Sequence, residues 1–270
     1  MPELPEVETT RRGLAPYVVG RTITRVEVRE PRLRWPVARG LPRALAASSI
    51  GSLERRAKYL LFGTDAGTLL VHLGMSGSLR YLPNPPAHGP HDHVDLVLAG
   101  GGCLRFNDPR RFGSWLLTTA PDSHPLLKPL GPEPLSPEFT ADYLADASRG
   151  RRVAIKPHLM NGRIVVGVGN IYANEALFRA GVHPLRAAGR IARARFEPLV
   201  DSIRAVLLDA LEEGGTTLRN YVDGEGNPGY FRQSLNVYER AGEPCKRCGD
   251  PIRERVVGQR ATYFCSSCQR

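Results

Sequence analysis

The sequence has little lysine, few cysteines and no long hydrophobic run. No stretch of about 18 apolar residues occurs, which excludes a helix that crosses a bilayer. The N-terminus, MPELPEVETT, is acidic where a secretory signal peptide needs positive charge, and no apolar segment follows it. Five cysteines, four of them in two tight pairs, do not form the pattern of a disulfide-stapled secreted domain. We therefore expect a protein of the reducing cytoplasm, with no membrane partner.

The charge is strongly positive and unevenly distributed. Lysine and arginine together number 37 against 27 acidic residues, a net charge of +10. Residues 1–150 contribute +3 of it and residues 151–270 contribute +7. An excess of this kind favours a polyanionic partner that docks on the second half. The alternative is a solvated basic surface from an arginine-rich composition, since lysine occurs at only four positions: Lys58, Lys128, Lys156 and Lys246.

The first part of the chain alternates between short β-type runs and turns. Residues 3–14 form the one expected helix there, because Leu4, Val7 and Leu14 fall on one stripe and glutamates occupy the first turn. From Thr22 to Leu117, short apolar runs are separated by glycine and proline. This spacing predicts an all-β sandwich or barrel. The predicted strands are TITRVEV, KYLLF, TLLVHLGM, HVDLVL, CLRF and SWLL.

After a proline-rich linker at residues 121–137, the pattern becomes helical. Helices are expected at residues 141–150, 170–181 and 194–215, the second of them stopped by Gly181. Residues 217–230 contain three glycines and a proline and are expected to form a mobile loop. With 270 residues, the chain has room for two modest domains.

The last thirty residues carry the strongest local motif. Cys245-x-x-Cys248 and Cys265-x-x-Cys268 enclose sixteen residues, the spacing of a structural zinc site with four thiolate ligands. Between them, RERVVGQRATYF predicts a hairpin that turns at Gly258-Gln259, with Arg260 at its tip. Two disulfides or redox-active pairs are the alternative. An intracellular chain favours one zinc ion.

Two other groups of potential ligands are interpreted as structural. Cys103 lies in a predicted strand and is expected to be a small core residue. His91, Asp92 and His93 are adjacent, and side chains that alternate between the faces of a strand cannot converge on one ion. We expect these three to be hydrogen-bonding residues.

Proline at position 2 suggests a chemical role for the N-terminus. Removal of the initiating methionine would leave Pro2 with a free secondary amine, and an α-amino group with a pKa of about 7.7–8.0 is partly neutral at physiological pH. Attack of such an amine on a sugar C1′ gives a cationic iminium that favours elimination of phosphates. Glu3 is adjacent to Pro2 and could transfer protons at the sugar ring oxygen, and Glu6 is one helical turn further on. The alternative is an ordinary helix start rich in proline and glutamate.

A resemblance decides between these interpretations. PELPEVETTRRGL, RRAKYLL, HLGMSGSLR, HDHVDL, DPRRFG, GVGNIYANEALF and the C-terminal cysteines occur in the order and spacing of formamidopyrimidine-DNA glycosylase. The resemblance covers essentially the whole chain. It implies an α+β multidomain protein with an N-terminal β-sandwich flanked by helices, a helix–two-turns–helix module and a zinc finger. The expected parts are a catalytic domain at 1–130, a linker with a first helix at 131–150, the helical module with a lid loop (217–230) at 151–230, and the zinc finger at 231–270.

The resemblance also implies roles for individual residues. Pro2 is the expected nucleophile, Glu3 the acid catalyst, Glu6 a second essential carboxylate and Lys58 a catalytic lysine. Met75, Arg110 and Phe112 are expected to fill the hole that an extruded base leaves. Arg110 offers only hydrogen-bond donors, and cytosine presents two acceptors to it where adenine presents one. This preference for cytosine would leave 8-oxoguanine opposite adenine in place. The further residues expected to bind DNA are His72, His91, Lys156, Asn170, Tyr238 and Arg260, the last of which also counts with the catalytic group.

The function that the resemblance implies is excision of oxidised purines from damaged double-stranded DNA, followed by cleavage of the strand by β/δ-elimination. A monomeric enzyme associated with the nucleoid is expected. The nearest alternative is an endonuclease VIII-like glycosylase for oxidised pyrimidines. PELPEV rather than PEGPE, together with Met75, Arg110 and Phe112, favours the purine enzyme. A non-catalytic damage sensor is the alternative from a different class.

Overall fold

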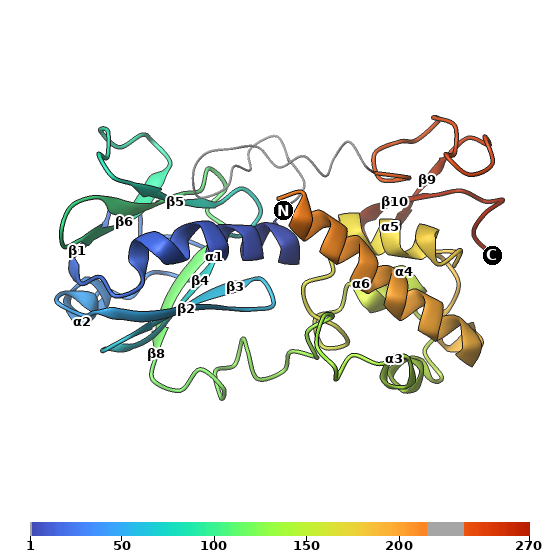
Figure 1. Ribbon diagram of the computed structural model, residues 1–270, viewed down its shortest axis with the longest axis horizontal. Helices are drawn as coiled ribbons and strands as arrows, with labels where there is room; N and C mark the ends of the chain where they lie inside the picture. The colour runs from blue at the N-terminus through green and yellow to red at the C-terminus, as the bar shows by residue number, and fades with distance from the viewer. Residues whose placement is uncertain (1, 215–234) are drawn as a thin grey trace. The chain divides into compact units, whose positions relative to one another are not determined.

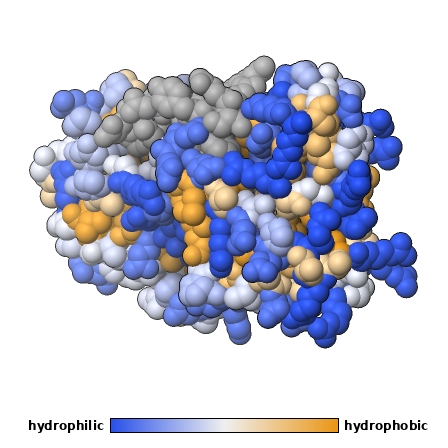
Figure 2. Space-filling view, turned by 45° about the vertical axis from the view of Figure 1, so that its right-hand side comes forward, coloured by the Kyte–Doolittle hydropathy of each residue, from blue (hydrophilic) through white to orange (hydrophobic). Residues whose placement is uncertain are grey.

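The computed structural model describes residues 2–214 and 235–270. The expected lid loop at 217–230 lies outside these residues, as does Met1. The described residues divide into two units, one of residues 2–128 with 213–214 and one of residues 129–212 with 235–270. No helix in the described part of the chain is both long and apolar enough to cross a membrane. Hydrophilic side chains predominate on the face in Figure 2, with smaller apolar areas between them.

The first unit begins with helix α1 (Leu4–Val18), which contacts strands of both sheets that follow. Leu4, Val7 and Leu14 are buried on one stripe, as the sequence predicts. The helix continues four residues beyond the predicted end, because Val18 supplies one more buried contact of the same stripe. In Figure 1, α1 lies along β2 and β3.

Two antiparallel four-stranded sheets form the predicted sandwich (Figure 1). One has the order β1-β6-β7-β5 and the other the order β2-β3-β4-β8. The strands of the first sheet are β1 (Ile23–Val28), β5 (Ser78–Leu82), β6 (Asp92–Leu98) and β7 (Cys103–Asn107). Those of the second are β2 (Ile50–Arg56), β3 (Tyr59–Thr64), β4 (Gly67–His72) and β8 (Ser114–Thr118).

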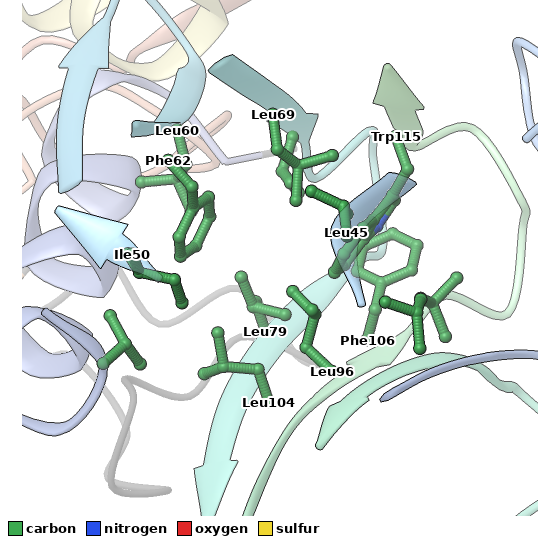
Figure 3. Close-up of a cluster of buried hydrophobic side chains, with 14 of the residues drawn as sticks. Leu45, Ile50, Leu60, Phe62, Leu69, Leu79, Leu96, Leu104, Phe106 and Trp115 are labelled. Atoms are coloured by element: carbon green, nitrogen blue, oxygen red, sulfur yellow. The ribbon is translucent and has the colours of Figure 1, made fainter. Parts of the chain in front are cut away.

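The core of this unit lies between the two sheets. Figure 3 shows Leu96, Leu104 and Phe106 of the first sheet meeting side chains of the second, such as Phe62 and Trp115. The rings of Phe106 and Trp115 meet edge to face, with their centroids 5.8 Å apart. Such aromatic pairs add about 0.5–1.5 kcal/mol beyond area burial. The predicted core role of Cys103 is confirmed, since its side chain is buried and burial raises its thiol pKa to about 11.

Three elements of this unit have no counterpart among the predicted ones. Strand β2 carries three charges and a serine, and its buried residues Ile50 and Leu53 are three positions apart, so no period-2 pattern marks it. Strand β5 and the short helix α2 (Leu41–Leu45) are each five residues long. Pairing with neighbours far along the chain, and not a local pattern, makes β2 and β5 strands.

The second unit is helical, as predicted, and ends in a hairpin. Helices α4 (Ile155–Leu159) and α5 (Asn170–Arg179) are joined by successive turns over residues 160–169, which gives the expected helix–two-turns–helix arrangement. The remaining elements are α3 (Ala141–Ser148), the short helices η1 (Ala188–Arg190) and η2 (Arg193–Arg195), α6 (Phe196–Glu212), β9 (Arg253–Val257) and β10 (Arg260–Phe264).

Candidate functional site

The N-terminal residues are held in place by a hydrogen bond within the first turn of α1. Glu3 and Glu6 are both buried, and so is Pro2. The backbone N–H of Glu3 donates to Oε2 of Glu6 over 2.8 Å. Glu3 is the N-cap, and a glutamate three residues after a cap reaches back in this way. The sequence Glu-x-x-Glu therefore fixes the backbone next to Pro2.

Lys58 lies on a turn that hydrogen bonds connect to this helix. Arg56 pairs with Tyr59, so Ala57 and Lys58 form a two-residue turn between β2 and β3, and Ala57 adopts a φ of 54°. Glu8 of α1 accepts from Arg55 over 3.2 Å, and Arg55 also donates to the carbonyl of Ala57 over 3.0 Å. These bonds tie the first turns of α1 to the turn that carries Lys58.

His72 ends β4 directly opposite Tyr59, the residue that follows Lys58. Burial, with the positive charges of Lys58 and Arg34, lowers the pKa of His72 to about 4. The imidazole is therefore neutral at physiological pH. Its Nδ1 accepts from the backbone N–H of Gly74 over 3.0 Å, so the proton of the neutral ring is on Nε2. His72 thus offers an N–H donor to a ligand.

Met75, Arg110 and Phe112 lie on two loops that are bonded to each other, residues 73–77 and 108–113; we call them the paired loops. The hydroxyl of Ser76 donates to Oδ1 of Asp108 over 2.7 Å and accepts from the N–H of Arg110 over 3.2 Å. The guanidinium carbon of Arg110 lies 4.8 Å from the centroid of the Phe112 ring. The structure thus brings the three predicted residues together on neighbouring loops.

Gly74 makes this close approach possible. It has a φ of 70°, and a Cβ added there would lie only 2.5 Å from the carbonyl carbon of Phe112. The backbone of Phe112 could not move far enough to relieve this clash, so only glycine fits. Arg110 and Phe112 are exposed. No carboxylate of the described residues lies within ion-pair distance of the Arg110 guanidinium, so its donors face solvent or a ligand.

The predicted hydrogen-bonding roles of Asp92 and His93 are confirmed, and His91 is exposed. Asp92 accepts from the N–H of Gly89 and from Asn107, each over 2.8 Å. Nε2 of His93 lies 2.8 Å from the carbonyl oxygen of Asp108. Within residues 2–214 and 235–270, the group that could hold a metal consists of cysteines, and these histidines do not belong to it.

In the second unit, Asn170 is the first residue of α5, and Gly169 is its N-cap. Gly169 has the extended backbone that a cap requires, so Asn170 does not cap the helix. Oδ1 of Asn170 is buried and makes no hydrogen bond with any described residue. A helix N-terminus is a suitable place for a phosphate, because the helix dipole favours negative charge there.

Lys156 and Arg260 meet different environments. Arg260 is exposed and directly follows the Gly258-Gln259 turn, where both residues have φ near 60°, so the predicted hairpin and its tip are confirmed. Lys156 is fully buried in α4, and its Nζ donates to the carbonyl of Ala261 over 2.6 Å and to the hydroxyl of Thr262 over 2.8 Å. Lys156 therefore anchors the hairpin next to Arg260.

Glu175 is a structural residue that no sequence pattern identified. It is buried in α5, and its carboxylate accepts from the backbone N–H groups of Asn236, Val237 and Tyr238 over 2.8–2.9 Å and from the Asn236 amide over 3.0 Å. The Tyr238 ring packs edge to face on Tyr263, 5.3 Å between centroids. Glu175 thus positions Tyr238. The available signal was an acidic residue inside the apolar run NIYANEALF.

The four paired cysteines form the zinc site. Their Sγ atoms all lie within 4.8 Å of one another, and the distances are 3.9 Å for Cys245–Cys268 and 3.5 Å for Cys248–Cys265. Four zinc–sulfur bonds of about 2.3 Å in a tetrahedron place the sulfurs about 3.8 Å apart, which these positions fit. The thiols are free, so the alternative of two disulfides is wrong. All four positions are filled by protein, which makes the metal structural.

Comparisons with known proteins identify the same family along the whole chain. Family models match residues 1–115 (formamidopyrimidine-DNA glycosylase N-terminal domain), 130–222 (formamidopyrimidine-DNA glycosylase H2TH domain) and 242–270 (zinc finger found in FPG and IleRS). Formamidopyrimidine-DNA glycosylases of Alkalilimnicola ehrlichii and Syntrophotalea carbinolica are 58% and 56% identical, with both chains covered completely.

Solved structures of the same kind superpose closely. The MutM (FPG) protein of Thermus thermophilus is 42% identical, with a TM-score of 0.89 over 99% of this chain and 98% of that one. The Lactococcus lactis Fpg in complex with DNA that contains an abasic site is 35% identical, with a TM-score of 0.91 over 99% of both chains. The chain belongs to the formamidopyrimidine-DNA glycosylase family.

Proposed function

We propose that this protein is a bifunctional DNA glycosylase and AP lyase of base excision repair, which removes oxidised purines such as 8-oxoguanine and formamidopyrimidines from duplex DNA. Family membership over the full length supports the activity class. The observation that supports its chemistry is the fixed start of α1, where the Glu6 carboxylate holds the backbone of Glu3 and so the position of Pro2.

Pro2 is the proposed nucleophile once Met1 has been removed. Its nitrogen attacks C1′ of the damaged nucleotide, the bond from C1′ to the base breaks, and the base leaves with the proton that the nitrogen loses. Glu3 protonates the ring oxygen of the sugar, which opens the ring and leaves an iminium on Pro2. Loss of a C2′ proton then expels the 3′ phosphate, and a second elimination expels the 5′ phosphate. Because Pro2 is a secondary amine, the iminium has no N–H to lose. Each elimination passes through a neutral enamine, and departure of the first phosphate re-forms the cation for the second elimination.

The paired loops are the proposed means of reaching the base. Extruding a nucleotide costs a few kcal/mol of stacking. Met75 and Phe112 would fill the vacated space, and Arg110 would donate to O2 and N3 of the orphaned cytosine. The exposure of Arg110 and Phe112 and the lack of a described carboxylate partner for Arg110 support these roles.

The other predicted residues are proposed to hold the DNA backbone. Lys58 and the Nε2–H of His72 would contact the strand beside the lesion, and Lys58 would also assist the chemistry at Pro2. Asn170, Tyr238 and the hairpin-tip Arg260 would bind phosphates in the second unit, with Lys156 acting at least in part by anchoring the hairpin. His91 is proposed to contact the backbone from its exposed position.

Borohydride trapping tests this function. The protein is incubated with duplex DNA that contains 8-oxoguanine opposite cytosine, and borohydride is added to reduce the iminium. We expect a covalent protein–DNA adduct, its loss in Pro2→Gly, and weaker strand cleavage in Glu3→Gln. Absence of an adduct would identify a non-catalytic damage sensor, and strong preference for thymine glycol would identify an endonuclease VIII-like enzyme. Mass spectrometry of the active protein must show Pro2 as its first residue.

We also propose that the protein works as a monomer on nucleoid DNA in the cytoplasm. One unit carries the proposed nucleophile and the other carries the zinc finger, so a single chain contains every proposed part. Light scattering of the protein, alone and with one duplex, should give the mass of one chain in both cases.

A further inference from the structure

A short basic segment of the first unit lies outside the residues that have been given a role so far. Between Pro31 and Leu53 the chain has four arginines and no acidic residue: Arg32, Arg34, Arg39 and Arg43. Trp35 stands among them and is 46% exposed, whereas Trp115, the other tryptophan, is completely buried. Arg32 forms an ion pair with Glu30 over 2.7 Å, whereas no described carboxylate pairs with Arg34, Arg39 or Arg43. A large exposed aromatic beside cations without an acidic partner is a composition that suits a nucleic-acid surface.

The segment is fixed to the paired loops. Leu33 and Val37 are buried in the sandwich core, so the backbone around Trp35 is anchored on both sides. The N–H of Arg34 donates to the carbonyl of Gly113 over 3.1 Å, next to Phe112. Arg111 of the paired loops donates to Glu30 over 3.2 Å, just before the segment begins. These bonds place Arg34 and Trp35 directly beside the loop that carries Arg110 and Phe112.

The positive charge of Arg34 acts on residues of the proposed site. Its guanidinium lowers the pKa of His72 and acts in the same direction on the Tyr59 hydroxyl, so it lies within electrostatic range of both residues. No carboxylate in the described part of the chain pairs with Arg34. Arg25, by comparison, is neutralised by Glu27 at 2.7 Å. An arginine held by its backbone but left without an acid is suited to an anionic ligand.

From this arrangement we propose that Arg34 and Trp35 form an additional contact for duplex DNA, continuous with the paired loops. Arg34 binds a backbone phosphate, and the Trp35 indole packs against the adjoining deoxyribose. The contact is independent of base sequence, because phosphate and sugar carry no sequence information. This inference rests on the proposed function, which supplies the DNA.

Quenching of tryptophan fluorescence by acrylamide tests the proposal, because one tryptophan is exposed and the other is buried. The probe is a duplex with a tetrahydrofuran abasic analogue, which is bound but offers no base to remove. We expect the quenchable emission to be protected when this duplex is added. Trp35→Leu should remove the quenchable emission and leave that of Trp115, which assigns the signal to Trp35.

The salt dependence of binding tests Arg34. Arg34→Gln should weaken binding of the same duplex by about 3- to 10-fold and reduce the slope of log K against log salt by about one phosphate contact. Arg25→Gln, with the same change in charge, should leave that slope unchanged. Melting curves check that all variants are folded.

Equal quenching with and without the duplex, or an unchanged salt slope in Arg34→Gln, would overturn the inference. Protection that grows with protein concentration in the absence of DNA would instead identify a second copy of the chain as the occupant, and it too would overturn the inference. Borohydride trapping by the unmodified protein is a separate measurement, so either conclusion can fail without the other.

Discussion

The carboxylate of Asp108 accepts a hydrogen bond from the hydroxyl of Ser76 over 2.7 Å, and this bond joins the loop of Met75 to the loop of Arg110 and Phe112. Its other oxygen accepts from the N–H of Gly113 over 2.8 Å. Asp108 is completely buried, so neither bond competes with water. One carboxylate therefore sets the relative position of the three side chains proposed to enter the duplex.

We expect Ser76→Ala to blunt discrimination between cytosine and adenine opposite 8-oxoguanine, because Arg110 loses its fixed position while its donors stay intact. Arg110→Ala should blunt it further. The measurement is the single-turnover rate of excision from each duplex. Ser123→Ala, an exposed serine of another loop, should keep the full ratio. Undiminished selectivity in Arg110→Ala would refute the donor argument for cytosine.

Glu175→Gln should lower the free energy of unfolding by about 2–4 kcal/mol. The carboxylate accepts four hydrogen bonds, and an amide would place an NH₂ group against backbone donors that then remain unpaired. Urea unfolding measures the loss, and hydrogen exchange at residues 236–238 localises it. Glu197→Gln, at an exposed position in α6, should change the stability by less than about 0.5 kcal/mol. Unchanged exchange at these amides would contradict the anchoring role.

His72 makes stability depend on pH. Its pKa is about 4 in the folded protein and near 6.5 in the unfolded chain, so between these values only the unfolded state takes up the proton. The free energy of unfolding should therefore fall as the pH falls, by up to about 2 kcal/mol from this residue between pH 7 and pH 5. His72→Gln should flatten the dependence. The exposed His88→Gln serves as the control, and equal slopes in the two variants would disprove the effect.

Removal of the metal should unfold the hairpin locally. The four thiolates approach one another closely, and without the cation their repulsion is uncompensated. A strong chelator should release one zinc ion per chain, which a colorimetric zinc assay measures. The amides of β9 and β10 should then lose their protection from hydrogen exchange. Binding of duplex DNA should weaken, because Arg260 stands at the hairpin tip. Chelation that leaves the exchange of these amides unchanged would argue against a structural metal.

The sequence by itself determined those features that local spacing or periodicity encodes. The cysteine pairs specified the zinc ligands, the period of Leu4, Val7 and Leu14 specified the buried face of α1, and Gly258-Gln259 specified the hairpin turn. Most strands of the sandwich were predictable for the same reason. The catalytic roles of Pro2 and Glu3 came from the family resemblance, since composition alone would allow an ordinary helix start.

The tertiary structure alone decided which polar side chains serve as supports. Ser76 and Asp108 are 32 residues apart, Lys156 and Ala261 are 105 apart, and Glu175 holds residues about sixty positions away. A hydrogen bond depends on distance and direction in space, and a buried lysine or glutamate has the same sequence signature as an exposed one. Only the folded chain reveals that these groups are desolvated and paired, and that Arg34 stands beside the paired loops without a carboxylate partner among the described residues.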